Sequence, residues 1–337
     1  MKTAIRLLLF VVGLAVLAGL VSTLGVGEIV GLIRRTGWHL LLILPIYGGC
    51  QLARAAALWL CQPQTAMLPY RDVLAIRVSA EAVRLLTFTG PLLSEPSKVW
   101  LFGRRGLGAT AGVATVAAEL VAHSLVATTL SIAAFLYVVA AFNLAPFVRG
   151  TAIVLVSVLI AYVGAATMAI GLRIYLIGGA AGVLRRRGLQ RLVPDAGAVR
   201  AMEDLLLLVL RERPVRLAGI LVCDVAANVF LVLEIFVALT AMAIAAPVHY
   251  SIVIEGCVKF VSLVFFVIPT QIGVSEGTYA ALFDILGLSA AGGVGLAFIR
   301  RLRTLAVSGI GLVIITALSR RRPGSVTPGN ERPEPAA

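Results

Sequence analysis

The chain has 337 residues, of which 60% are hydrophobic and only 13% charged, and its mean hydropathy is +1.01. A soluble domain is about half apolar and about a quarter charged, so one water-soluble body could not bury so much apolar surface, and the chain belongs in a lipid bilayer. This composition excludes a secreted disulfide scaffold, a disordered protein and most cytosolic enzyme folds. The net charge of +13 fits the positive-inside bias and anionic headgroups better than a nucleic-acid partner.

Six apolar runs are long enough to cross a membrane, since a crossing helix needs about 20 residues. The first, up to about residue 24, resembles a signal peptide, but its length and the spans that follow favour an uncleaved helix. The others cover about 38–60, 109–141, 151–177, 215–246 and 290–319. The sequence therefore predicts an all-α polytopic integral membrane protein with about six crossing helices in one domain, 1–320, followed by a disordered tail at 321–337.

Two further segments combine charged residues with a central break and predict a helix, a break and a second helix. They cover about 72–102, broken at Thr89-Gly90-Pro91, and about 251–287, broken at 269–273. Irregular backbone inside the hydrocarbon must be buried in protein or line a wet cavity, which re-entrant hairpins achieve. After each break comes Ser-Glu (Ser94-Glu95 and Ser275-Glu276), which we interpret as a serine N-cap with a glutamate in the first turn.

Loop charge predicts the orientation. The arginine-rich connection at about 178–214, with an apolar stripe that predicts an amphipathic surface helix, and Arg320-Arg321-Arg322 should lie in the cytoplasm. Both termini are then cytoplasmic in the inner (plasma) membrane. The first hairpin opens inward and the second outward, which is the pattern of an inverted repeat. Arg34, Arg35 and Arg149 fall outside and oppose this orientation.

Charged residues inside apolar segments each cost about 2.5–3.5 kcal/mol at the bilayer centre unless they have a partner or a purpose. Several can pair with a neighbour three or four residues away on their own helix, and such pairs could merely join helices. Arg300, Arg301 and Arg303 have no acid nearby in sequence. Either the last apolar run starts later and leaves them at the outer interface, or they face a polar interior, which we favour. The same-helix candidates are Arg77 with Glu81, Glu81 with Arg84, Glu95 with Lys98, Glu119 with His123, Asp224 with Asn228, and Glu255 with Lys259.

A cavity lined by Lys98, Lys259, Arg301 and helix N-termini would attract an anion, most naturally a lipid phosphate whose acyl chains stay in the bilayer. Glu95 and Glu276 would hold these cations when the site is empty, and Arg84 would act at the cytoplasmic mouth or lie at the surface. The cysteines and histidines have no metal-binding spacing, so we expect no metal and no cofactor. The candidate headgroup residues are Arg84, Glu95, Lys98, Lys259, Glu276 and Arg301, the candidate gates are Gly90, Pro91, Pro269 and Gly273, and the candidate proton carriers are Glu119 and His123.

These motifs resemble the transmembrane region of the lysylphosphatidylglycerol synthase/flippase family over roughly residues 5–320. Its signature stretch is similar to the first hairpin, from Glu81 through Gly90-Pro91 to Glu95-Pro96-Ser97-Lys98. Pro269, Gly273 and Glu276 match its Pro-x-x-x-Gly-x-x-Glu element, Arg301-Leu302 its Arg-Leu, and Glu119 with His123 the glutamate of the following helix. Leu93-Ser94 stand where the family usually has two glycines.

The resemblance implies the translocation half of the family's activity. It predicts a flippase or scramblase-like transporter of an anionic phospholipid or a polyprenyl- or isoprenoid-linked lipid. The chain ends at Ala337 without the soluble aminoacyl-transferring domain of full-length synthases, so we expect no aminoacylation. Two alternatives remain open, namely a non-catalytic partner of a lipid-synthesising or lipid-modifying enzyme and an enzyme acting on lipid headgroups. The sequence has no GxxxxGK[ST] motif for ATP, so transport would use an ion gradient or run downhill.

Overall fold

The computed structural model describes residues 36–64, 67–86, 90–172, 214–264 and 273–320, with a few single positions between them. The predicted first helix up to residue 24, nearly all of the predicted amphipathic connection at 178–214 and the predicted tail at 321–337 lie outside these residues. In the described part, nine helices are α3 (His39–Leu60), α4 (Tyr70–Leu86), α5 (Gly90–Arg104), α6 (Ala109–Ala141), α7 (Pro146–Gly171), α10 (Pro214–Ala241), α11 (Val248–Val264), α12 (Val274–Ile285) and α13 (Ala290–Arg320).

Long apolar helices form the frame of the bundle. Four helices, α3, α6, α7 and α10, are long and apolar enough to cross a membrane among the described residues. The 31-residue α13 is equally long but carries three arginines near its middle. The helix predicted at 151–177 begins earlier, at Pro146, since proline is favoured in the first turn, where its missing N–H costs nothing. The chain is therefore an all-α polytopic membrane protein.

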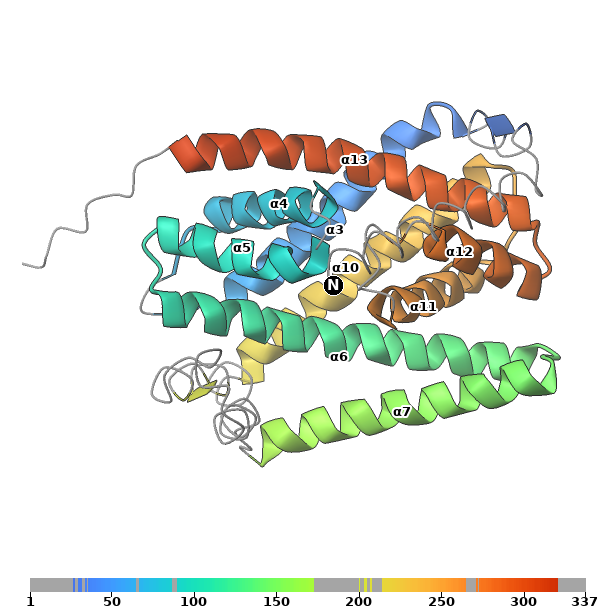
Figure 1. The fold of residues 1–337 in the computed structure, drawn as a ribbon, viewed down its shortest axis with the longest axis horizontal. Helices are drawn as coiled ribbons and strands as arrows, with labels where there is room; N and C mark the ends of the chain where they lie inside the picture. Colours follow the sequence, from blue (N-terminus) through green and yellow to red (C-terminus); the bar gives the residue numbers. More distant parts are fainter. Residues whose placement is uncertain are drawn as a thin grey trace, which may run out of the picture.

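The two broken segments form the predicted hairpins, α4 with α5 and α11 with α12. These helices have 17, 15, 17 and 12 residues, whereas a crossing needs about 20. Within each hairpin the two helices pack on each other. In Figure 1 the turn from α5 to α6 lies at the left end of the bundle and the turn from α12 to α13 at the right end. The hairpins thus enter from opposite ends, as predicted.

The helix starts after the two breaks differ from the prediction that serine caps them. In the first hairpin α5 already begins at Gly90, so Ser94 lies inside the helix. In the second, Gly273 is the N-cap of α12, with a φ of +81° that favours glycine. Glu276 then lies at the third helical position, where its Oε2 accepts a hydrogen bond from the Gly273 backbone N–H at 2.8 Å. The serine N-caps were wrong, while the capping role of Glu276 is confirmed.

The contacts between helices repeat in two halves. Matching α3, α4, α5 and α6 in order with α10, α11, α12 and α13 pairs almost every major contact with an equivalent one. Helix α4 packs on α13 as α11 packs on α6, and α5 packs on α6 as α12 packs on α13. The matched helices α3 and α10 pack on each other and run in opposite directions through the centre of Figure 1. This is an inverted repeat, and α7 stands outside both halves.

Glycines allow the close approach of the two halves. A Cβ at Gly256 of α11 would lie 2.5 Å from the Cβ of Ala134 and 2.8 Å from the Leu130 carbonyl oxygen on α6. On the matched contact, a Cβ at Gly311 of α13 would collide with the Val78 carbonyl oxygen on α4. Small residues at such crossings let membrane helices pack by van der Waals contact.

This packing predicts that alanine lowers stability at Gly311 but not at the neighbouring Gly309. We expect Gly311→Ala to lower the free energy of unfolding by about 1–3 kcal/mol, because the added methyl group overpacks the α4–α13 contact. Gly309 lies on the same helix, and a Cβ there would meet no atom within 4 Å, so Gly309→Ala should leave stability unchanged or raise it by up to about 1 kcal/mol. Denaturant unfolding in mixed micelles measures both, and equal effects would contradict a close contact at Gly311.

Candidate functional site

The Glu119 carboxylate is the centre of a buried charge cluster. It lies on α6 and is fully buried. Arg54 of α3 contacts its Oε1 at 2.9 Å, and Lys98 of α5 contacts its Oε2 at 3.1 Å. Arg77 of α4 lies 3.9 Å from Oε1, and Lys98 also contacts Glu95 at 2.8 Å. We call these five side chains the Glu119 cluster.

The Glu119 cluster carries three positive and two negative charges from four helices. The long helices α3 and α6 each contribute a charged residue from an apolar stretch, and the α4–α5 hairpin brings two of the cations to α6. Lys98 is fully buried, and Arg77 is 6% exposed. A buried charge is tolerated only when it is paired and hydrogen-bonded. The Glu119 carboxylate contacts all three cations, and Glu95 contacts only Lys98. The cluster as a whole therefore has an excess of one positive charge.

A second cluster surrounds Arg300 of α13. Its guanidinium lies 2.9 Å from Glu255 of α11 and 3.7 Å from Glu234 of α10, and it donates a hydrogen bond to the Tyr279 hydroxyl of α12. Glu234 also pairs with the buried Arg303. Lys259 adds a contact to Glu255 at 3.4 Å. We call these six side chains the Arg300 cluster, and it confirms that Arg300 and Arg303 face the protein interior.

The two clusters occupy matched places in the inverted repeat, and their central residues have opposite charges. Glu119 is the eleventh residue of α6, and Arg300 is the eleventh residue of α13. Arg77 and Glu255 are each the eighth residue of the matched helices α4 and α11. In the first half one acid joins two bases from α3 and α4. In the second half one base joins two acids from α10 and α11.

Tyr47 of α3 links Glu81 of α4 to the Arg300 cluster. Its hydroxyl donates a hydrogen bond to Glu81 of α4 at 3.1 Å, and Glu81 pairs with Arg84. The guanidinium of Arg303 lies 3.7 Å above the Tyr47 ring, within cation–π range. Charged and polar side chains therefore run from the α4–α5 hairpin to α13 through the interior of the bundle.

The predicted headgroup residues divide among four places. Lys98 and Glu95 belong to the Glu119 cluster, and Lys259 belongs to the Arg300 cluster. Arg301, 26% exposed, pairs with the fully buried Glu276 at 2.7 Å beside the start of α12. Arg84, 45% exposed, pairs with Glu81, which fits both a mouth residue and a surface residue. The structure thus ion-pairs every predicted headgroup residue but does not gather them around one cavity.

Of the predicted gates, Gly273 caps α12, while Gly90 and Pro91 begin α5. Pro269 lies outside the described residues. Of the predicted proton carriers, Glu119 is held by its three cations. His123, one turn further along α6, instead contacts Asp224 of α10, with 3.3 Å between its Nδ1 and Oδ1.

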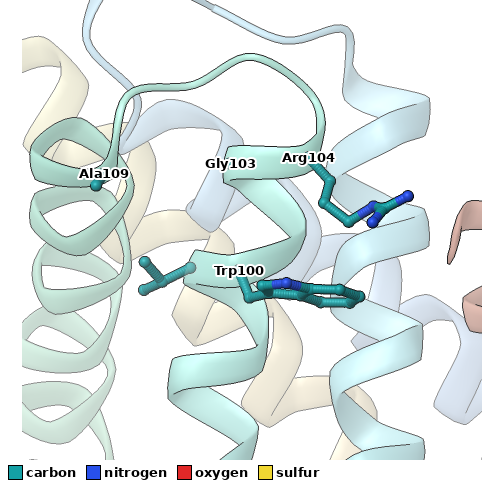
Figure 2. A pocket seen from close by; sticks show the side chains of 5 residues that line it. Trp100, Gly103, Arg104 and Ala109 are labelled. Carbon is teal, nitrogen blue, oxygen red and sulfur yellow. The ribbon is translucent and has the colours of Figure 1, made fainter. Parts of the chain in front are cut away.

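A hollow of about 380 Å³ lies at the end of α5, lined by Val99, Trp100, Gly103, Arg104 and Ala109. Figure 2 shows the Trp100 and Arg104 side chains on one side of α5, with Ala109 at the start of α6 across from them. The guanidinium of Arg104 lies 5.4 Å from the Trp100 ring centre. Tryptophan beside arginine is typical of a membrane interface. The hollow contains none of the cluster residues, so the predicted headgroup residues do not line it.

Sequence reasoning missed Arg54, Glu234 and Tyr47. The available signal was a charged residue in the middle of a crossing helix, at Arg54 in α3 and Glu234 in α10. Their partners are 65 and 69 residues away along the chain. Pairing at three or four residues finds Glu95 with Lys98 but cannot find these.

The chain was compared with known proteins. Residues 4–311 match the family described as the lysylphosphatidylglycerol synthase TM region. The chain belongs to this family. No curated protein and no solved structure matches it. Membership supports a membrane protein with a lipid-related function, and it covers both halves of the repeat and both charge clusters.

The Glu119 cluster predicts unequal costs for its two acids. Glu119→Gln leaves the buried Arg77 and Lys98 and the half-buried Arg54 short of a counter-charge, and we expect it to lower the free energy of unfolding by about 3–5 kcal/mol. Glu95 is 30% exposed and pairs with Lys98, which keeps Glu119 as a partner. Glu95→Gln should therefore cost less than about 1 kcal/mol. Unfolding in mixed micelles compares them, and equal losses would show that Glu119 is not the central charge.

Proposed function

We propose that this protein moves a lipid with an anionic headgroup, an anionic phospholipid or an isoprenoid-linked lipid, between the two leaflets of the membrane. The Glu119 cluster is the observation that carries the proposal. Three cations share one buried carboxylate, and the cluster has an excess of one positive charge. A phosphate offers several oxygens to such cations in charge-assisted hydrogen bonds.

In this proposal the headgroup replaces Glu119 as the partner of Lys98 and Arg54. The carboxylate keeps the cations in place when no headgroup is bound, so Lys98 and Arg54 always have an anionic partner. The acyl chains stay in the bilayer while the phosphate moves along the polar side chains between the two clusters. The two hairpins, which enter from opposite ends, provide the elements for alternating access. Arg301 with Glu276 serves as a second headgroup contact beside α12.

We further propose the orientation and the membrane. The turn from α5 to α6, the end of α7, the start of α10 and the end of α13 lie at the same end of the bundle in Figure 1. Arg104 and Arg105 lie at this end, and the arginine-rich connection leads from α7 to α10. The positive-inside bias therefore supports a cytoplasmic location for this end, with both termini inside, in the inner (plasma) membrane.

We propose transport rather than chemistry for this chain. The acids of both clusters are neutralised by arginine or lysine, an arrangement that suits binding more than bond cleavage. A direct role in moving lipid also differs from the alternative of a non-catalytic partner, which would depend on a lipid-synthesising enzyme. The experiment below distinguishes these roles.

Purified protein in liposomes should speed the movement of fluorescent phosphatidylglycerol between leaflets, measured by quenching the outer leaflet with dithionite. Lys98→Gln and Arg301→Ala should each slow it by at least about tenfold, because each removes a charge-assisted hydrogen bond. Asp284→Asn, on an exposed position of α12, is the control and should keep the wild-type rate.

Three results would contradict the proposal. Wild-type liposomes no faster than protein-free liposomes, together with co-purification of a lipid-synthesising enzyme, would favour the partner role. Wild-type rates in both Lys98→Gln and Arg301→Ala would remove these residues from the lipid path. A headgroup altered during the assay would show an enzyme.

A further inference from the structure

One buried acid differs from the others in its partner. The buried carboxylates within the nine helices α3–α7 and α10–α13 are those of Glu81, Glu119, Asp224, Glu234, Glu255 and Glu276. Five of them form ion pairs with arginine or lysine. Asp224 instead contacts His123, with 3.3 Å between Oδ1 and Nδ1. It therefore has no permanently charged partner in contact among the residues that the structure describes.

The second oxygen of Asp224 increases this difference. Asp224 is fully buried, and among the described residues its Oδ2 accepts no hydrogen bond. Asn228, one turn later on α10, uses its Nδ2 to donate to the Asp224 backbone carbonyl at 2.7 Å, so it does not serve Oδ2. An ionised carboxylate in this position has lost its contact with water, which is unfavourable. A proton removes that charge, so the His123–Asp224 pair can bind one.

The pair lies beside the proposed headgroup site. His123 is four residues after Glu119 on α6, so both side chains lie on one face of that helix. The charged groups that act on Asp224 are Arg54 of α3, Arg77 of α4, Glu119 of α6 and Lys259 of α11. Helix α13 also packs on α10, and its Arg300 and Arg303 face Glu234 instead.

We propose that the His123–Asp224 pair is a proton-binding site that fills when an anionic headgroup binds at the Glu119 cluster. The positive charges of Arg54 and Arg77 oppose a proton on Asp224, and a bound phosphate neutralises them. By linkage, the headgroup strengthens proton binding and the proton strengthens headgroup binding by the same factor. The headgroup then moves with a proton and carries less net charge through the bilayer. This inference rests on the proposed function and adds a means of coupling it to a pH gradient.

The test measures the affinity of the protein for dihexanoyl phosphatidylglycerol, whose phosphodiester does not titrate near neutral pH. Wild-type affinity should fall by about tenfold per pH unit on the alkaline side, as expected when one proton binds with each headgroup. Asp224→Asn should remove this slope, because an amide takes up no proton. Asp284→Asn is the matched control and should keep the slope.

Infrared spectroscopy of the lipid-free protein gives an independent measurement. A protonated Asp224 has the carbonyl stretch of a carboxylic acid, which should appear as the pH is lowered and be missing from Asp224→Asn. If the wild type binds no phosphatidylglycerol at any pH, the proposed headgroup is wrong, and this band alone decides whether the pair binds a proton.

Three results would overturn the proton site. One is a flat pH dependence of wild-type affinity. Another is an unchanged slope in Asp224→Asn, which would place the proton elsewhere. The third is a slope that sodium ions abolish, because a metal cation would then occupy the site instead of a proton.

Discussion

Burial of charge away from water is the constraint on which this bundle depends. In lipid the apolar side chains of neighbouring helices gain little by contacting each other rather than acyl chains, so packing and polar pairs hold the helices together. The Glu119 cluster joins α3, α4, α5 and α6, and the Arg300 cluster joins α10, α11, α12 and α13. Each cluster thus ties one hairpin to the two long helices of its own half. A headgroup that exchanges with one of these pairs acts directly on the elements that hold that half together.

Opposite charges at matched positions show that the repeat preserves geometry rather than residue type. A carboxylate held by two guanidinium groups and a guanidinium held by two carboxylates place ion pairs at the same positions between the same helices. The first half differs by an additional cation, Lys98, where the second half has Tyr279 in contact with its central residue. Each cluster nevertheless contains three cations and two carboxylates, because Arg303 and Lys259 add to Arg300 in the second half.

Much of the fold could be predicted from the sequence, because a bilayer requires long apolar helices and tolerates broken helices only where protein buries them. Helix α6 covers the predicted range of 109–141, since glycines at 106 and 108 precede its apolar run and Asn143 and Pro146 follow it. Both hairpins follow from a break at glycine and proline among charged residues. The serine N-caps failed because helix starts depend on backbone conformation, here the positive φ of Gly273.

The sites were harder to predict than the fold. Same-helix spacing found Glu95 with Lys98 and Glu255 with Lys259. It assigned Arg77 to Glu81, whereas in the structure Arg77 turns to Gln51 and Glu119 on other helices. Which face of α4 meets which face of α6 depends on the tertiary packing, for which one sequence carries no local signal. The two oppositely opening hairpins predicted an inverted repeat, but the opposite charges at its matched positions become visible only when the contacts are known.

Helix α7 has a consequence for the architecture as a whole. Within one half, the chain crosses with α3, enters and leaves with the hairpin, and returns with α6, so it finishes on the side where it started. Joined directly, two such units would insert with the same polarity. The single additional crossing of α7 changes the parity of the chain and turns the second unit upside down. A helix whose main contact is with α6 thus gives the protein a two-fold axis in the plane of the membrane. Without α7, the two units would have the same orientation and could not form the inverted repeat.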